Sequence, residues 1–229
     1  MESKINSILV QLLMCCLAFA VAYADEDSDI ALILKARGEI KIHRAASGEW
    51  LEGRRGTRLN SGDVIKTGND ALAAVIFTDD KSLVKIRENS TLSIKGKREK
   101  SSIIKRLKFA FGKIWVSVQR QKSRFYLETP SGVAAVKGTK FYCLVDEHGN
   151  CTIICDEGLV ALINKFGKVL VEKGYTGFSS KNKSPFSRKT DKDQEPDWGD
   201  KPDEDNQLEF EFQDNEGNIK TLKINYREK

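Results

Sequence analysis

The sequence is poor in the residues and motifs that carry most enzyme chemistry. Its 229 residues include only two histidines, and no H-E-x-x-H, G-x-S-x-G or G-x-G-x-x-G motif occurs. The carboxylate pairs Asp79-Asp80 and Asp156-Glu157 stand where turns are expected, and turn aspartates usually bond to their own backbone. Adjacent residues of a strand face opposite ways, so such a pair could not flank one substrate bond within a strand. We therefore predict no enzyme, no cofactor and no catalytic or metal site.

Long apolar runs are also scarce, and the longest stands at the N-terminus. Residues 8–22 are mostly apolar, Lys4 precedes them, and Ala22-Tyr23-Ala24 is an A-x-A cleavage sequence before an acidic stretch. This pattern is typical of a secretory signal peptide, so we predict cleavage after Ala24 and export to the periplasm or the extracellular space. A membrane anchor is the alternative, although the run is short for a span.

Three cysteines, Cys143, Cys151 and Cys155, remain once the leader is removed. If Val145 faces Cys151 across the turn between them, all three share one sheet face and Cys143 is diagonal to the other two. Export permits a disulfide among them, with one thiol left over; buried free thiols are the alternative. With His148 they read C-x4-H-x2-C-x3-C, which matches no common zinc spacing.

The net charge of +5 is unevenly distributed, because residues 95–108 concentrate the basic side chains. We expect a loop there, and either it is simply solvated or it binds an anionic envelope polymer or lipid headgroups. No aromatic residue interleaves with it, so we predict no nucleic-acid partner. The candidate partner surface is Lys95, Lys97, Arg98, Lys100, Lys105 and Arg106.

Short alternating segments separated by turn residues fill the chain from residue 30 to 178. Residues 71–77 and 83–86 flank a turn at 79–82, a hairpin pattern, and residues 103–111 fit a strand better than a helix. Gly112-Lys113 is expected to turn the chain into the strand at 114–118. No βαβ spacing occurs, so we predict an all-β sandwich or roll, solenoid-like, of short strands.

The stretch T-P-S-G-V-A-A-V-K-G-T-K-F, residues 129–141, is punctuated at both ends. Pro130 pushes Thr129 into extended geometry, and Gly138 interrupts a buried apolar run. The pattern favours a strand corner over a phosphate-binding loop, which would need a glycine-rich turn opening a helix.

The C-terminal part of the chain has a different composition. Residues 179–206 hold three of the four prolines, many charges and few aliphatics, which predicts a flexible linker. Residues 207–229 alternate around a polar turn at 214–218, which predicts a β-hairpin with one apolar face. A lone hairpin is marginally stable, so we expect it to dock, on its own domain, on another copy or on a partner.

Further short motifs accompany the stretch at 129–141. They include G-E-I at 38–40 with Arg44 and Trp50, G-D-x-I-x-T-G at 62–68, F-T-D-D-K-S at 77–82, G-K-I at 112–114 and E-G-x-V at 157–160. Taken together, these motifs resemble the FecR-domain family, exported β-rich bacterial domains known from iron-uptake signalling regulators. The family residues, with an expected structural role, are Gly62, Asp63, Thr67, Gly68, Thr129, Pro130, Gly138, Thr139 and Phe141.

The resemblance covers residues 35–178 and implies the domain without the regulator's cytoplasmic segment and membrane helix, because a leader stands there instead. Lys81 also replaces the usual turn glycine, so that turn is expected to differ. We predict a signal peptide (1–24), a FecR-like β-domain (30–178), a linker (179–206) and a hairpin (207–229). The implied function is a non-catalytic module that binds an envelope protein in signalling or assembly.

Overall fold

The protein is all-β, as the turn-punctuated sequence predicts. The computed structural model describes residues 29–99, 102–120, 124–191, 207–213 and 219–225, and no helix occurs among them. Contacts divide the chain into two units, Met1–Lys189 and Thr190–Lys229. The predicted leader lies outside the described residues. The described part of the chain contains no helix that is long and apolar enough to cross a membrane.

The first unit contains seventeen strands in residues 31–189. They are β1 (Ala31–Arg37), β2 (Ile40–His43), β3 (Trp50–Glu52), β4 (Arg58–Leu59), β5 (Val64–Thr67), β6 (Leu72–Phe77), β7 (Leu83–Ile86), β8 (Thr91–Glu99), β9 (Ser102–Val118), β10 (Phe125–Thr129), β11 (Gly132–Val136), β12 (Thr139–Val145), β13 (Cys151–Glu157), β14 (Leu159–Asn164), β15 (Gly167–Glu172), β16 (Tyr175–Ser180) and β17 (Lys183–Lys189).

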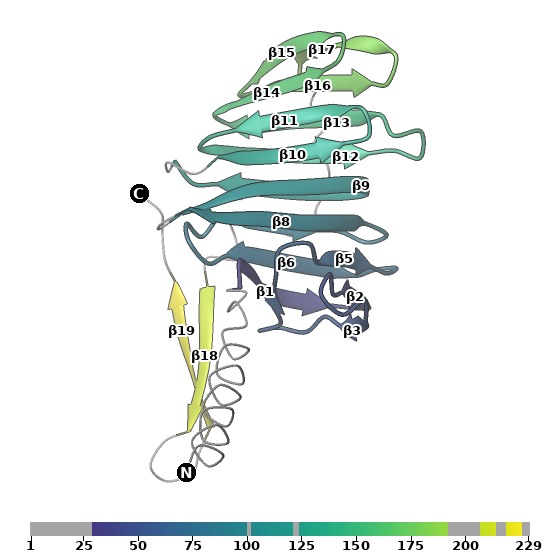
Figure 1. The fold of residues 1–229 in the computed structure, drawn as a ribbon. Coiled ribbons are helices and arrows are strands. Elements are labelled where there is room, and N and C mark those ends of the chain that lie inside the picture. The colour runs from purple at the N-terminus through teal and green to yellow at the C-terminus, as the bar shows by residue number, and fades with distance from the viewer. Residues whose placement is uncertain (1–28, 100–101, 121–123, 192–206, 214–218, 226–229) are drawn as a thin grey trace, which may run out of the picture. The chain divides into compact units, whose positions relative to one another are not determined.

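The strands form two ladders that share β9. Ladder A runs β4-β1-β6-β7-β9-β12-β13-β16-β17, and ladder B runs β3-β2-β5-β8-β9-β10-β11-β14-β15. Neighbours are antiparallel, except that β9 and β10 are parallel. Figure 1 shows the strands stacked one above the next, from β1 and β3 at one end to β15 and β17 at the other. From the N-terminal to the C-terminal end of this unit, the chain passes repeatedly from one ladder to the other. This is the predicted roll-like arrangement.

Strand β9 links the ladders through a bend at Gly112. Its first half pairs with β8 in ladder B, and its second half pairs with β7 and β12 in ladder A. Gly112 has a φ of +109°, and a Cβ there would lie 2.0 Å from Ser90 Oγ. The turn predicted at Gly112-Lys113 is therefore wrong, because the glycine bends one continuous strand and does not reverse it.

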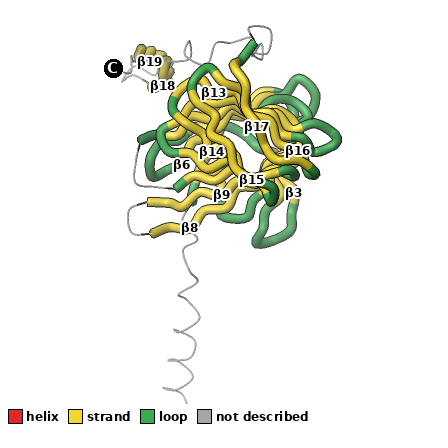
Figure 2. The backbone as a smooth tube through the Cα atoms, turned by 90° about the horizontal axis from the view of Figure 1, so that it is seen from above, coloured by secondary structure: helices red, strands yellow, loops and turns green. Residues whose placement is uncertain are grey.

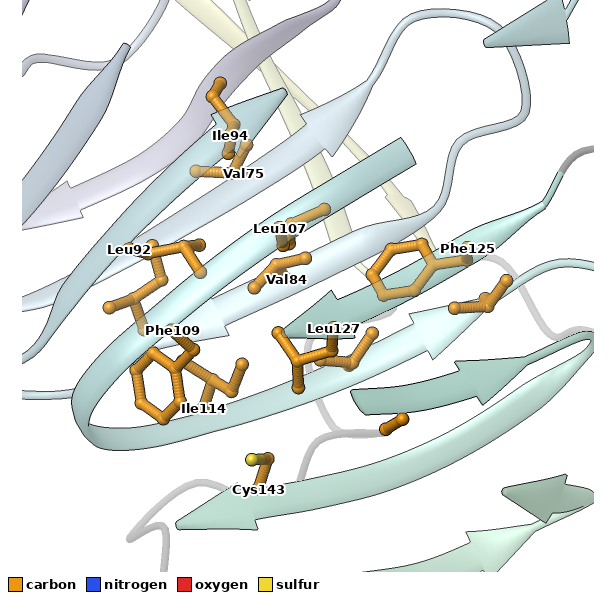
Figure 3. Packing of buried hydrophobic residues seen from close by; sticks show 14 of the residues in the cluster. Val75, Val84, Leu92, Ile94, Leu107, Phe109, Ile114, Phe125, Leu127 and Cys143 are labelled. Carbon is orange, nitrogen blue, oxygen red and sulfur yellow. The ribbon is translucent and has the colours of Figure 1, made fainter. Parts of the chain in front are cut away.

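The core lies between the two ladders and receives side chains from both. Figure 3 shows Leu107 and Leu127 of ladder B in the same interior as Val84, Ile114 and Cys143 of ladder A. Fully burying an aliphatic or aromatic side chain contributes about 1.5–3 kcal/mol. The alternating apolar residues that predicted strands thus also hold the ladders together.

The boundary predicted at residue 178 is wrong by eleven residues, since β16 continues to Ser180 and β17 extends to Lys189. Pro185, one of the signals for a linker, lies within β17. A proline is tolerated there because β17 is an edge strand, bonded only to β16 among the described strands. The rest of the predicted linker, 192–206, lies outside the described residues.

The second unit contains the predicted C-terminal hairpin. Strands β18 (Gln207–Gln213) and β19 (Ile219–Asn225) pair antiparallel, with Phe210 opposite Leu222. The two strands therefore lie where the alternating sequence pattern predicted them, on either side of residues 214–218.

Candidate binding surface

The Gly62-Asp63 motif forms a tight turn around a buried carboxylate. Asp63 is buried, and its oxygens accept hydrogen bonds from the backbone N–H groups of Ala45 (3.0 Å) and Asn60 (2.9 Å). Arg44 also donates to Asp63, at 2.5 Å, from a side chain that is 22% exposed. These bonds fix the turn through backbone N–H groups, which is a structural role of the kind expected for Asp63.

The other end of that motif is held by Thr67 and Gly68. The buried Thr67 hydroxyl donates to the carbonyl of Arg87 (2.5 Å) and accepts from the N–H of Ser90 (3.0 Å). Gly68 donates its N–H to the carbonyl of Glu39 at 2.8 Å. These bonds connect three turns of the stack, so the motif has a structural role here.

The stretch at 129–141 is a strand corner, as predicted. Thr129 ends β10, and its hydroxyl donates to the carbonyl of Gly132 (2.9 Å), where β11 begins; Pro130 is exposed in the turn between them. Gly138, with a φ of +65°, then carries the chain from ladder B to ladder A.

The first residues of β12, which follow Gly138 in ladder A, are largely buried. The hydroxyl of Thr139 donates to the carbonyl of Leu159 at 3.1 Å, and Phe141 is fully buried. The family motif thus serves folding, and no ligand site is needed to explain it.

The basic run at 95–108 is a β-hairpin, and the loop predicted there is wrong. The cations lie on β8 and β9, which run side by side (Figures 1 and 2). Lys95, Lys97, Arg98 and Arg106 are exposed on these strands. Lys100 lies outside the described residues.

Lys105 is not part of this surface, because its side chain is fully buried. Its Nζ lies 2.9 Å from Asp79 Oδ2, 2.7 Å from Asp80 Oδ2 and 5.2 Å from the centre of the Phe77 ring. The backbone N–H of Ile103 also donates to Asp79 Oδ2, at 2.7 Å. The adjacent aspartates therefore converge on one ammonium group, which the turn allows and a regular strand would not.

Lys81 sits in the same turn and keeps the backbone that a glycine would adopt. Its φ is +61°, in the left-handed region, and its N–H donates to the carbonyl of Phe77 at 3.2 Å. The different turn expected from the missing glycine is therefore not required, because Lys81 takes up the strained conformation itself.

The three cysteines share one buried face, as the predicted register requires. Val145 is opposite Cys151, and the sulfur atoms of Cys143 and Cys151 lie 3.6 Å apart. Burial raises the pKa of Cys143 well above its ordinary value, and it raises the pKa of Cys155 to about 11. All three are free thiols in the structure, and the candidate disulfide among them stays a prediction.

The two histidines lie at separate places in the first unit. His43 is half-buried and its ring lies 4.9 Å from that of Trp50. His148 is exposed in the turn before β13. The residues that the structure describes contain no group of His, Cys, Asp and Glu that could hold a metal ion.

The outer face of ladder B carries unusually apolar side chains towards β15. Leu159 and Ile163 of β14 are 43% and 38% exposed, and Leu170 of β15 is 46% exposed. Antiparallel sheets that face water on one side normally carry polar residues there. Register places Leu170 beside Ala161, and Ile163 beside Val133, so these residues form one continuous patch.

A shallow, open hollow of about 450 Å³ lies on the same outer face, where β10, β11 and β14 meet. The register aligns Tyr126, Ala135 and Ala161 in one row across the three strands. Arg106 covers the Tyr126 ring, with its guanidinium carbon 4.7 Å from the ring centre. Sequence reasoning missed this hollow, because it depends on two alanines that only the register brings together.

Comparisons with known proteins agree with the resemblance seen in the sequence. The family model described as FecR protein matches residues 63–161. No curated protein sequence matches the chain significantly.

Two crystal structures, at 2.50 and 1.65 Å resolution, of a "putative anti-sigma factor" from Parabacteroides distasonis also match. Each has a TM-score of 0.48 and 14% identity, and each match covers 56% of this chain and 60% of the other. The chain thus spans less than two thirds of their length.

The family match runs from Asp63, the buried turn aspartate, to Ala161 in the floor of the hollow. It contains most of the motifs that carried the resemblance, and Gly62 and the elements at 38–50 precede it. This chain therefore carries a FecR domain at residues 63–161.

Proposed function

We propose that the protein is a non-catalytic, exported module that binds another envelope protein in signalling or assembly. The observation that carries this proposal is the apolar outer face of ladder B, made by Leu159, Ile163 and Leu170. Contiguous exposed apolar surface commonly marks a site of protein–protein contact. The FecR domain supports the same class of function.

The chemistry of the described residues supports binding over catalysis. The acidic pair Asp79-Asp80 is occupied by Lys105, and His43 packs against Trp50. A catalytic site needs titratable groups that converge on a pocket open to substrate. The hollow on ladder B is open, but its polar groups are cations and a tyrosine.

The proposal is tested by crosslinking in the intact envelope. A photoreactive residue placed at Leu170 should crosslink to a discrete protein, and the substitution Ile163→Lys should abolish the crosslink, because a charge would be placed within the apolar patch. Leu51→Lys is the matched control, since Leu51 is similarly exposed (42%) on β3, at the opposite edge of ladder B. An absent crosslink, or one that Leu51→Lys weakens equally, would contradict the proposal.

Export after cleavage behind Ala24 is part of the proposal and has its own test. N-terminal sequencing of the protein purified from the envelope fraction should begin at Asp25. A protein that retains residues 1–24 would favour a membrane anchor instead.

A second candidate function is binding of an anionic polymer or of lipid headgroups by the β8–β9 hairpin. It is favoured by the exposed Lys95, Lys97 and Arg98, which lie close together near the end of that hairpin. Retention on phosphatidylglycerol vesicles should weaken steeply with salt. Lys95→Glu with Lys97→Glu should abolish it, and unchanged retention would remove this candidate.

A further inference from the structure

We propose that the hollow at the junction of β10, β11 and β14 binds an acidic, extended polypeptide segment that carries one large apolar side chain. The inference rests on the proposed function and assigns a ligand chemistry to one place on the outer face of ladder B. The side chains used are Arg124, Tyr126, Ala135, Lys137, Leu159 and Ala161.

The floor of the hollow is made by small residues between larger ones. Ala135 and Ala161 are direct neighbours across β11 and β14, and Tyr126 is the neighbour of Ala135 on the other side. Because an alanine ends at Cβ, the sheet surface is low there, between the Tyr126 ring and the Leu159 side chain. The volume of about 450 Å³ lies within the range of ordinary ligand sites, and it can take one large side chain.

Two cations stand together at one end of the floor. Phe125 pairs with Val136, so Arg124, just before Phe125, and Lys137, just after Val136, lie at the same end of the β10–β11 pair. Both are exposed, and no ion pair joins either to a carboxylate of the described residues. A ligand with carboxylates near its apolar group could form ion pairs with both cations.

Two other cations on this face, Arg106 and Lys108, differ from Arg124 and Lys137 because a carboxylate lies near them. Arg106 and Lys108 approach Glu128, at 3.4 and 3.8 Å, so their charge is partly offset. Arg106 also covers the Tyr126 ring, and this contact helps to fix the aromatic wall of the hollow before any ligand arrives. A wall that is already ordered costs less conformational entropy when a ligand binds.

The shape of the site favours a polypeptide over a membrane or a polyanion. A bilayer would take up the exposed Leu159 side chain but would leave the floor beside it unfilled, because Ala135 and Ala161 end at Cβ. A polyanion would use the cations and leave the apolar floor unoccupied. An extended segment satisfies both, because alternate side chains point to one face and can enter the hollow beside a carboxylate.

The test is fluorescence anisotropy of a short dye-labelled peptide, rich in Asp and Glu with one central Phe, titrated with the full chain. The peptide should bind, and replacing its Phe by Ser, or its acids by Asn and Gln, should weaken binding about tenfold or more. Arg124→Glu with Lys137→Glu should weaken binding similarly through charge. Ala161→Phe should do so by filling the floor, on an outward-facing position where the fold is expected to tolerate it.

The matched control is Lys113→Glu, which reverses an exposed cation on the ladder A half of β9, and it should leave the affinity unchanged. No binding, or equal weakening by Lys113→Glu, would overturn the inference. So would binding of phosphatidylglycerol vesicles that Ala161→Phe abolishes, because the ligand would then be a membrane. If the peptide fails while the crosslink from Leu170 persists, the hollow is wrongly assigned and the proposed function stands.

Discussion

Two buried polar clusters in this protein differ in how far they are cut off from water. Asp63 is buried, but its cationic partner Arg44 is 22% exposed, and two backbone N–H groups complete its bonding. Lys105 is fully buried, and so are the side chains of both its partners, Asp79 and Asp80. The first cluster keeps an exit to solvent and the second does not, so the cost of breaking them should differ.

The largest expected effect comes from Lys105→Met, which removes the buried cation that lies between Asp79 and Asp80 in the closed cluster. Asp79 and Asp80 would be left buried without their ammonium partner, and breaking a buried pair typically costs about 3–5 kcal/mol. Urea unfolding followed by fluorescence gives the change in the free energy of unfolding.

Arg106→Met is the control for that variant, because Arg106 is the next residue, exposed, and paired with Glu128 at the surface. It should cost less than about 1 kcal/mol. Adding Asp79→Asn and Asp80→Asn to Lys105→Met should recover part of the loss. Equal effects of Lys105→Met and Arg106→Met would show that isolation from water does not set the cost.

The second effect is expected from Asp63→Ala, at about 2–3 kcal/mol. The N–H groups of Ala45 and Asn60 would lose their acceptor, while Arg44 could still reach water. Thermal and urea unfolding measure the loss, and Glu49→Ala, at an exposed position, is the control. A loss larger than that of Lys105→Met would break the comparison, because the open cluster would then matter more than the closed one.

The family resemblance marked Asp63 as a structural residue, whereas the Lys105 cluster was missed, and the difference has a physical reason. Asp63 stands in the glycine-punctuated stretch 62–68 and bonds to the N–H of Asn60 three residues away, so part of its environment is local. Its other two partners, Ala45 and Arg44, are 18 and 19 residues away and were not predicted. Lys105 meets Asp79 and Asp80 across 25–26 residues of chain, by a side-chain contact between β9 and the turn after β6 that only the fold establishes. The sequence did contain a sign that Lys105 is buried, because strand alternation puts it on the same face as the apolar Ile103 and Leu107.

The same limit applies to the rest of the molecule. Strand positions and the register at Val145–Cys151 follow from local alternation and turn residues, and they were predictable. The passage of β9 between ladders, and the alanine floor at Ala135 and Ala161, depend on contacts between distant strands. Of the binding surface, only the exposed part of the basic run could be predicted from the sequence.

Lys81→Gly tests whether the turn beneath the closed cluster is strained, and it should stabilise the protein. A non-glycine residue at a φ of +61° costs about 1–2 kcal/mol, and glycine's greater freedom in the unfolded chain offsets part of that gain. We expect a net increase of about 0.5–1 kcal/mol in the free energy of unfolding. Lys173→Gly, in the exposed turn before β16, should not stabilise. A loss at Lys81→Gly would mean that the Lys81 side chain itself supports the turn.

The smallest effect concerns Cys155, whose buried thiol is neutral. It destabilises the fold only when it loses its proton. Burial, and then the nearby Asp156, raise the pKa of this thiol from 9.0 to about 11. In the unfolded chain the thiol loses its proton first, so the stability it contributes is present below about pH 9 and is lost as the pH rises towards about 11.

Urea unfolding of the wild type and of Cys155→Ala, across that alkaline range, isolates this contribution from the other groups that titrate there. The wild type should lose stability more steeply than the variant, because only the wild type carries a thiol whose charged form is excluded from the fold. Parallel curves would show that the Cys155 thiolate is tolerated inside the protein. The position would then resemble Asp63, with its route to solvent, more than the closed cluster around Lys105.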